Sequence, residues 1–207
     1  MRRQLVPSVI AIVLFTVLSL AYGVGTTLVD QVLFKHKADG SLVENAQGKV
    51  VGSSLIGQDF TKPKYFHPRP AADGYASGPD YSDGSNYGPT NPPFLYGVDD
   101  PSTPKVDESK TTGVDDLVRA YRKENGLSAQ VPVPVDAVTA SGSGLDPDIS
   151  VANAKLQAHR VAEARHLPVS EVLHLIRANT DERALGILGE PAVNVLRLNL
   201  ALDRLRH

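Results

Sequence analysis

The longest apolar segment of the chain is a run of 25 residues without a charge, from Leu5 to Val29. A helix of that length spans about 37 Å at about 1.5 Å per residue, more than the roughly 30 Å of a hydrocarbon core. The run therefore predicts one transmembrane helix over 6–29, preceded by a short N-terminal segment, 1–5. The remaining residues, 30–207, lie on the other side of the membrane.

A secretory signal peptide is the alternative for this run. Arg2 and Arg3 form a small basic segment before it, and Ser19–Ala21 or Ala21–Gly23 resembles a cleavage site. We favour a retained anchor, because the run is longer than the apolar region of a signal peptide. The two arginines place the N-terminus in the cytoplasm and residues 30–207 outside, in keeping with the positive-inside rule.

The rest of the pattern alternates between short strands and helices. Two short apolar runs around the turn 45–48 predict a hairpin within 40–60. Periods of three and four residues predict helices over 114–125 (ending at Gly126), 150–165, 170–178 (capped by Ser170) and 198–205, and β-branched runs predict strands over 131–138 and 193–196. The predicted fold is a single extracytoplasmic α+β domain, 30–207, with helices concentrated at the C-terminal end and one N-terminal transmembrane helix before it.

A loop rich in proline, glycine and aromatic residues fills 62–112. Its nine prolines each remove a backbone donor and favour extended geometry at the preceding residue, which argues against long helices and central strands. Tyr65 and Phe66 stand among aromatic residues in its first half, and aromatic side chains favour buried contacts. We therefore expect the first half of the loop to be held against the rest of the domain.

Composition narrows the classes of function. The chain carries a net charge of −2, and Arg2 and Arg3 account for +2 before the span, which leaves −4 on the outer domain. An acidic surface disfavours nucleic acid and anionic lipid headgroups as partners. The chain has no cysteine, which excludes disulfides, a thiolate nucleophile and a metal–thiolate site.

One glycine-rich turn is a candidate phosphate-binding loop. Ser141, Gly142, Ser143 and Gly144 follow a predicted strand and precede a predicted helix, where backbone amides can bind an anion. The third glycine of a dinucleotide-binding fingerprint is missing, and no Lys-Ser/Thr pair follows as in a P-loop. The alternative is a flexible turn whose corner is set by Asp146 and Pro147.

Two further sequence patterns resemble a zinc site and a helix-turn-helix, and each has a simpler explanation. His159, Glu163 and His166 share one helical face, as zinc ligands do, but a solvated face explains them better and we predict no metal site. Residues 161–176 have the spacing of a helix-turn-helix, which makes a membrane-anchored DNA-binding regulator the alternative function. Their surroundings carry little positive charge, so we expect no nucleic-acid partner.

Several segments, taken in order, resemble one family. They are Gly40-Ser-Leu-Val43, Gly52-Ser-Ser-Leu-Ile-Gly-Gln-Asp-Phe60, Tyr65-Phe-His-Pro-Arg-Pro70, Gly84-Ser-Asn86, Val133-Pro-Val-Asp-Ala-Val-Thr-Ala-Ser-Gly-Ser-Gly-Leu-Asp146, Arg160-Val-Ala162, Leu188-Gly-Glu-Pro191 and Val193-Asn-Val-Leu-Arg-Leu-Asn-Leu-Ala-Leu-Asp203. This series is similar to the C subunit of the Kdp-type potassium-transporting P-type ATPase. The family more often has Gly-Arg-Pro-Ser after Tyr-Phe-His, whereas here Pro68 precedes Arg69 and Ala71 follows Pro70.

The resemblance implies a non-catalytic accessory subunit of a high-affinity potassium import complex in the plasma (inner) membrane. Its implied partners are a channel-like potassium-translocating subunit, an ATP-hydrolysing P-type subunit, a small hydrophobic peptide subunit and the lipid bilayer. The implied role is that of a catalytic chaperone, needed for assembly, which raises the ATP affinity of the hydrolysing subunit. No covalent cofactor is implied. ATP is implied as a ligand, either bound by this subunit or affected by it indirectly, and potassium is the ion that the complex transports.

Two groups of residues are the candidate functional positions. We expect a functional surface formed by Phe66, Arg69, Asn86, Thr139, Ser141, Gly142, Ser143 and Asp146. The alternative is that the glycines and prolines of these segments only set the turns of a small scaffold. In the span, small residues allow close packing against a partner helix, and these are Ser19, Ala21, Gly23 and Gly25.

Overall fold

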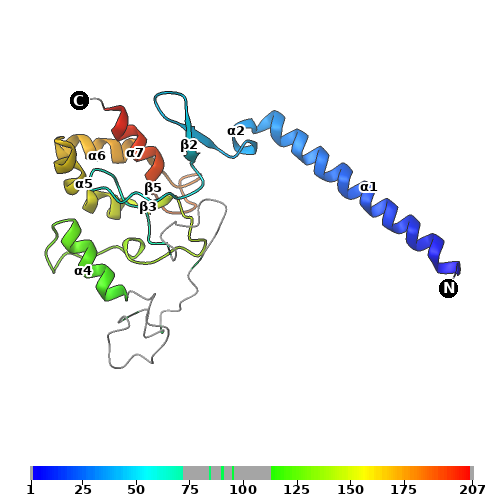
Figure 1. The fold of residues 1–207 in the computed structure, drawn as a ribbon, viewed down its shortest axis with the longest axis horizontal. Coiled ribbons are helices and arrows are strands. Elements are labelled where there is room, and N and C mark those ends of the chain that lie inside the picture. The colour runs from blue at the N-terminus through cyan, green and yellow to red at the C-terminus, as the bar shows by residue number, and fades with distance from the viewer. Residues whose placement is uncertain (1, 72–83, 85–89, 91–94, 96–112, 206–207) are drawn as a thin grey trace. The chain divides into compact units, whose positions relative to one another are not determined.

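The computed structural model describes residues 2–71, 84, 90, 95 and 113–205. Most of the predicted aromatic loop, including Asn86, lies outside these residues. The chain divides into two units, 1–42 and 43–207 (Figure 1), and each is described by itself.

The first unit is dominated by helix α1, Arg2–Leu33, which is followed by the short helix α2, Lys35–Ala38. In the part of the chain that the structure describes, α1 is the one helix long and apolar enough to cross a membrane, over Arg3–Leu33, and none of its described side chains is buried. The hydroxyls of Thr26 and Thr27 donate to carbonyls within the helix, so they present no unpaired donor to an apolar solvent. The predicted helix is confirmed and extends a few residues further at both ends.

A β-hairpin follows. Strand β1, Leu42–Glu44, pairs with β2, Val50–Ser53, across the turn predicted from the sequence. The Asn45 side-chain oxygen accepts the backbone N–H groups of Gln47 and Lys49, both at 3.0 Å, and Gly48 has a positive φ of 73°. The hairpin prediction is confirmed, since Asn and Gly supply the geometry that a tight turn requires.

Helix α4, Val114–Glu124, agrees with its predicted bounds, and Gly126 follows it with a φ of 63°. The predicted strand over 131–138 is wrong. That segment contains no strand and ends in a short 3₁₀ helix, η1, Val135–Ala137. Pro132 and Pro134 explain the difference, because neither has an N–H to donate to a β ladder and their β-branched neighbours cannot replace it.

The C-terminal part combines three helices with a small sheet (Figure 1). Helices α5, Val151–Arg165, α6, Val169–Ala178, and α7, Val195–Arg204, lie together, and the antiparallel sheet has the order β3-β5-β4. Its strands are β3, Asp148–Ser150, β5, Ala192–Asn194, and β4, Thr180–Asp181. The α+β class with mostly C-terminal helices is thus confirmed.

Capping residues fix where these helices begin. Ser150 caps α5, since its Oγ accepts the Asn153 N–H at 3.1 Å. Asn194 caps α7 by accepting the Arg197 N–H at 3.1 Å, which ends the strand two residues earlier than the predicted Leu196. Ser170 is not a cap, because α6 begins at Val169 and Pro168 stands at the capping position without a side-chain hydrogen bond.

The hydrophobic core lies between α5, α6, α7 and the sheet. Three alanines spaced by four residues, Ala154, Ala158 and Ala162, make one face of α5 nearly flat, and all three are buried. Their small size allows α6 to approach closely with Val172 and Ile176, both 0% exposed. The core is aliphatic except for one fully buried aromatic side chain, that of Phe66.

Candidate functional site

Arg69 contacts two other predicted site residues, Thr139 and Asp146, which lie 70 and 77 positions later in the chain. The Arg69 guanidinium donates from Nη1 to Oδ2 of Asp146 at 2.9 Å and from Nη2 to the Ala140 carbonyl at 3.2 Å. Its Nε lies 3.4 Å from the Thr139 carbonyl. Arg69 therefore links the segment after Phe66 to residues 139–146, here called the serine-glycine loop.

The serine-glycine loop is a turn closed by its own hydrogen bonds. The Gly144 N–H donates to the Ser141 carbonyl at 3.2 Å, and the Leu145 N–H donates to Oγ of Ser143 at 3.2 Å. The hydroxyls of Ser141 and Ser143 lie 3.3 Å apart, and Ser141 is buried. At least two amides of the loop are thus used inside the turn, where they do not face a bound anion. This geometry favours the alternative of a structural turn.

Gly84 lies directly against this loop. A Cβ built on Gly84 would be 1.8 Å from the carbonyl oxygen of Gly142 and 2.7 Å from its carbonyl carbon. Both atoms are backbone, so a larger residue at position 84 forces the loop to move. The absence of a side chain therefore allows the two segments to touch, which accounts for the glycine of the Gly84-Ser-Asn86 segment.

We expect Gly84→Ala to destabilise this contact by about 1–3 kcal/mol through overpacking. Hydrogen exchange measures it directly, because the amides of Gly144 and Leu145 are protected only while the loop is closed, and their exchange is expected to accelerate. Gly142→Ala is the matched control, since a Cβ on Gly142 meets nothing within 4 Å. Equal exchange in both variants would contradict the contact.

The structure corrects the expectation that Phe66 belongs to the functional surface. Its side chain is 0% exposed and packs in the core. Asn199 on α7 holds its backbone from both sides, accepting the Phe66 N–H at 2.8 Å and donating to the Phe66 carbonyl at 2.9 Å. A residue buried in this way stabilises the domain and presents no surface. At Phe66, within the described part of that loop, the chain is held against the rest of the domain as expected.

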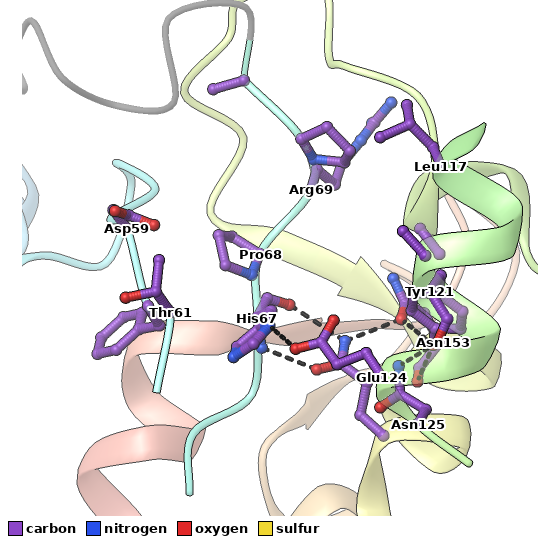
Figure 2. Close-up of a pocket in the computed structure, with 16 residues that line it drawn as sticks. Asp59, Thr61, His67, Pro68, Arg69, Leu117, Tyr121, Glu124, Asn125 and Asn153 are labelled. Carbon is purple, nitrogen blue, oxygen red and sulfur yellow. Dashed lines mark hydrogen bonds and ion pairs between the residues drawn. The ribbon is translucent and has the colours of Figure 1, made fainter. Parts of the chain in front are cut away.

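A cavity of about 310 Å³ lies beside Arg69 (Figure 2). Residues of the loop after β2, of helix α4 and of helix α5 line it. Two of these residues, His67 and Glu124, are in contact, with His67 Nδ1 2.9 Å from Glu124 Oε1. Its charged and polar lining includes Asp59, Thr61, His67, Arg69, Tyr121 and Glu124. The cavity lining therefore includes both acidic and basic side chains, and one of its acids, Glu124, pairs with His67.

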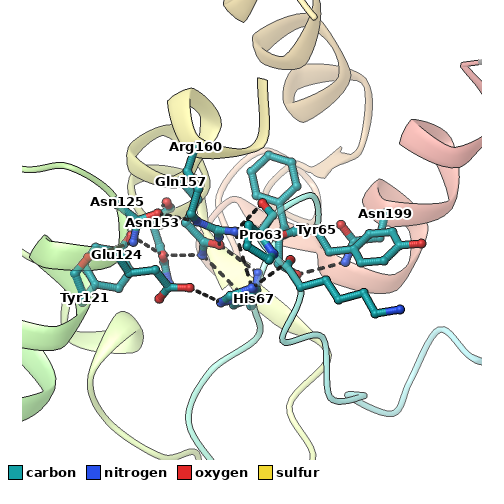
Figure 3. A network of polar contacts seen from close by, with 12 residues as sticks. Pro63, Tyr65, His67, Tyr121, Glu124, Asn125, Asn153, Gln157, Arg160 and Asn199 are labelled. Atoms are coloured by element: carbon teal, nitrogen blue, oxygen red, sulfur yellow. Dashed lines mark hydrogen bonds and ion pairs between the residues drawn. The ribbon is translucent and has the colours of Figure 1, made fainter. Parts of the chain in front are cut away.

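A buried polar network, which shares Asn125 and Gln157 with the cavity lining, surrounds Arg160 (Figure 3). The Arg160 side chain, 8% exposed, donates to the carbonyls of Pro63 and Tyr65 at 2.6 and 3.0 Å. It also donates to Oδ1 of Asn125 at 3.0 Å and to Oε1 of Gln157 at 2.8 Å. One guanidinium thus connects the segment 63–67, the end of α4 and helix α5.

Gln157 and Asn153 extend this network. Gln157 accepts the His67 N–H at 2.8 Å and donates to the His67 carbonyl at 3.1 Å, while it also donates to Asn153 at 2.9 Å. The Tyr121 hydroxyl donates to Oδ1 of Asn153 at 2.8 Å. Side-chain amides therefore act on the segment 63–67 as a neighbouring strand would, pairing with both its N–H and C=O groups.

The environment changes several pKa values in this network. The hydrogen bond from His67 lowers the pKa of Glu124 below its ordinary range, in spite of partial burial. Burial lowers the pKa of Arg160 and raises that of the Tyr121 hydroxyl. Glu124 is thus held as a carboxylate near a buried cation, and the tyrosine is held as a neutral donor.

Sequence reasoning did not identify this network. Asn153, Gln157 and Arg160 stand at i, i+4 and i+7 of α5, a line of polar residues that predicts a shared helical face. The helical face considered from the sequence was that of His159, Glu163 and His166, for which we expected a solvated face. His159 and Glu163 are exposed, and His166 follows the helix end with a φ of 56°. Within the described residues no group of metal-binding side chains gathers.

The small residues of the span form two pairs. Ser19 and Gly23 are four residues apart on α1, as are Ala21 and Gly25, and the two pairs lie about 200° apart around a helix that turns about 100° per residue. A Cβ on either glycine would meet nothing within 4 Å. Each pair therefore leaves room for close approach on its own face of the helix, so these residues do not form a single stripe.

Comparison with known proteins now gives the family. The family described as "KdpC: K+-transporting ATPase, c chain" matches residues 5–204. The Potassium-transporting ATPase KdpC subunit of Mycobacterium tuberculosis (strain H37Rv) is 53% identical over 208 residues, covering 99% of this chain and 100% of the relative. The proteins of the same name from Caulobacter vibrioides and Herpetosiphon aurantiacus are 48% and 44% identical, covering 98% and 100% of this chain and 94% and 98% of theirs.

The matches cover both the apolar helix and the domain that follows it, which is the full extent of the predicted resemblance. They lend no support to the alternative of a DNA-binding regulator. In the structure the two helices of the supposed helix-turn-helix, α5 and α6, pack on each other through buried alanines. The chain belongs to the KdpC family, the c chain of K+-transporting ATPases.

Proposed function

We propose that this chain is a non-catalytic accessory subunit of an ATP-driven, high-affinity potassium import complex. In this proposal it is needed for assembly and acts as a catalytic chaperone, raising the ATP affinity of the hydrolysing subunit. Its partners are that subunit, a channel-like potassium-translocating subunit and a small hydrophobic peptide subunit. The observation that carries the proposal is the match to the c chain family over residues 5–204.

The proposed placement is a single-pass protein of the plasma (inner) membrane, with its N-terminus in the cytoplasm and the domain outside. Helix α1 supports it, because 31 residues from Arg3 to Leu33 are more than the roughly 20 that a bilayer requires. The two arginines at its start match the positive-inside rule. Open space at Gly23 and Gly25 allows partner helices to approach it closely.

We further propose that the effect on ATP is indirect. ATP binds on the cytoplasmic side, whereas the domain is placed outside, and the serine-glycine loop uses the amides of Gly144 and Leu145 within its own turn. The chain then acts by binding one conformation of the transporter more tightly than another. Such a difference appears at a distant site as a coupling free energy, and it reaches ATP through the membrane-spanning helices.

Reconstitution of the transporter with and without this chain tests the proposal. We expect the ATP concentration for half-maximal potassium-stimulated hydrolysis to rise by roughly 5- to 150-fold without the chain, the range given by couplings of about 1–3 kcal/mol. Hydrolysis that is indifferent to the chain, together with failure of the chain to co-purify, would overturn the proposal.

A control distinguishes direct from indirect action on ATP. Ser143→Ala removes one serine hydroxyl of the serine-glycine loop, a group that a directly bound nucleotide would contact. The substitution leaves helix α1 unchanged. The indirect route predicts the same ATP requirement for this variant as for the native chain. A raised ATP requirement, with the variant still folded and co-purifying, would favour direct contact.

A further inference from the structure

A short hairpin projects three large apolar side chains into solvent. Ala184 and Leu188 exchange backbone hydrogen bonds of 2.8 and 2.9 Å, and the Ile187 N–H donates to the Ala184 carbonyl at 3.2 Å. Leu185, Ile187 and Leu188, here called the apolar tip, are 90%, 75% and 57% exposed. Adjacent exposed apolar side chains of this size mark interaction sites more often than ordinary surface.

The backbone of the apolar tip is strained. Leu185 has a φ of 54°, in the left-handed region that glycine and asparagine adopt readily and leucine does not, and Gly186 follows with a φ of 76°. A turn of this kind normally carries Asn-Gly. Leucine here raises the energy of the turn and exposes its side chain to water at the same time. Neither effect stabilises the free domain.

The base of the hairpin is firmly held. Arg183 and Glu190 form an ion pair of 2.5 Å across it, and the strand β4 that precedes it pairs with β5. Asp181, at the end of β4, makes an ion pair with Arg197 of α7. The apolar tip is therefore a preformed projection, and little ordering is required when it binds.

We propose that the apolar tip inserts into an apolar socket on the outer surface of another membrane subunit of the same transporter. This inference rests on the proposed function. Three side chains bury far less than the roughly 800 Å² per partner of a stable interface, so the tip does not hold a complex by itself. It suits a partner already brought close by another contact, and the apolar helix α1 supplies such a contact within the membrane.

Charge and composition favour a protein socket over the bilayer. Loops that enter a membrane surface carry aromatic or basic residues next to their apolar ones. Residues 180–191 contain no aromatic residue and no lysine, and their one arginine is paired with Glu190. The two further acids, Asp181 and Glu182, give anionic headgroups nothing to attract.

Site-specific cross-linking in the assembled transporter identifies the occupant. A photoreactive amino acid at position 185 of the full-length chain, in native membranes, is expected to cross-link to one transporter subunit. The same probe at position 55, where Leu55 is 62% exposed, is the control and is expected to give no such product. Products with lipid only, with a second copy only, or no product at position 185 would each overturn the inference.

A substitution provides a second measurement. Leu185→Asn removes the apolar side chain and suits the left-handed backbone, so the thermal midpoint of the chain is expected to stay equal or rise. Dissociation from the transporter is expected to become roughly tenfold faster, as for loss of a hot-spot residue. Leu55→Asn is the matched control. An unchanged dissociation rate for Leu185→Asn would contradict the inference, whereas a native chain that fails to co-purify would contradict the proposed function instead.

Discussion

Replacing Arg160 by methionine is expected to lower the free energy of unfolding by about 3–5 kcal/mol, the cost of removing one member of a buried charged network. The side chain is 8% exposed, and four acceptors lose a hydrogen bond: the carbonyls of Pro63 and Tyr65 and the side-chain oxygens of Asn125 and Gln157. Of these, Gln157 still accepts the His67 N–H. Methionine fills similar space but donates nothing. An acceptor left buried without a donor costs about 1–3 kcal/mol, so several together outweigh the benefit of a neutral side chain.

Urea unfolding of the full-length chain in detergent, followed by the near-ultraviolet circular dichroism of its tyrosines, measures this loss. Arg119→Met is the control, because Arg119 is an exposed arginine on α4 with an ion pair to Asp116 and is expected to change the free energy by less than about 1 kcal/mol. Arg160→Lys keeps the charge but not the planar donor arrangement, and it is expected to recover only part of the loss. If methionine proved as stable as arginine, the network would not stabilise the domain.

Replacing Phe66 by alanine is the second large effect, with an expected loss of about 3–5 kcal/mol. The side chain is 0% exposed and packs among aliphatic residues of the core, and its backbone is fixed by Asn199, so the cavity left behind has little freedom to collapse. The same unfolding measurement applies. Phe34→Ala, at a side chain that is 54% exposed, is the matched control and is expected to cost little.

Phe66→Leu separates a role in the core from a role at a surface. Leucine keeps the site apolar, so the variant is expected to fold with a smaller loss and to leave the ATP requirement of the reconstituted transporter unchanged. A variant that kept its free energy of unfolding but altered the ATP requirement would return Phe66 to the functional surface. The burial of the side chain predicts the first result.

The sequence predicted those elements whose cause is local. A charge-free run is sufficient for α1, and a helical period ended by glycine is sufficient for α4. The strand predictions failed where individual residues override the preference of their apolar neighbours for β structure. Pro132 and Pro134 prevent the strand that the surrounding valines favour, and Asn194 ends β5 by capping α7. These outcomes depend on two missing backbone donors and one side-chain acceptor, and the alternation of apolar and polar residues contains no information on either.

The polar network was missed for a different reason. Polar residues on a helix usually face water, but Gln157 and Arg160 bond to the segment 63–67, which crosses α5 without forming a strand. Nothing near residue 160 predicts a partner near residue 65. By contrast, the pairing of Arg69 with Asp146 joins two residues that had both been selected, although their contact was not foreseen.

The contacts that hold residues 63–67 also determine when this segment can fold during synthesis. Phe66 pairs with Asn199, 133 positions later in the chain, and Tyr65 donates a hydrogen bond to Asp203. Contacts of such long range form late in folding, because the intervening chain must first be brought together. The ribosome therefore delivers the membrane helix first and completes the domain last. A chain that ends before its final ten residues lacks Asn199 and Asp203, so it leaves Phe66 and Tyr65 without these two partners.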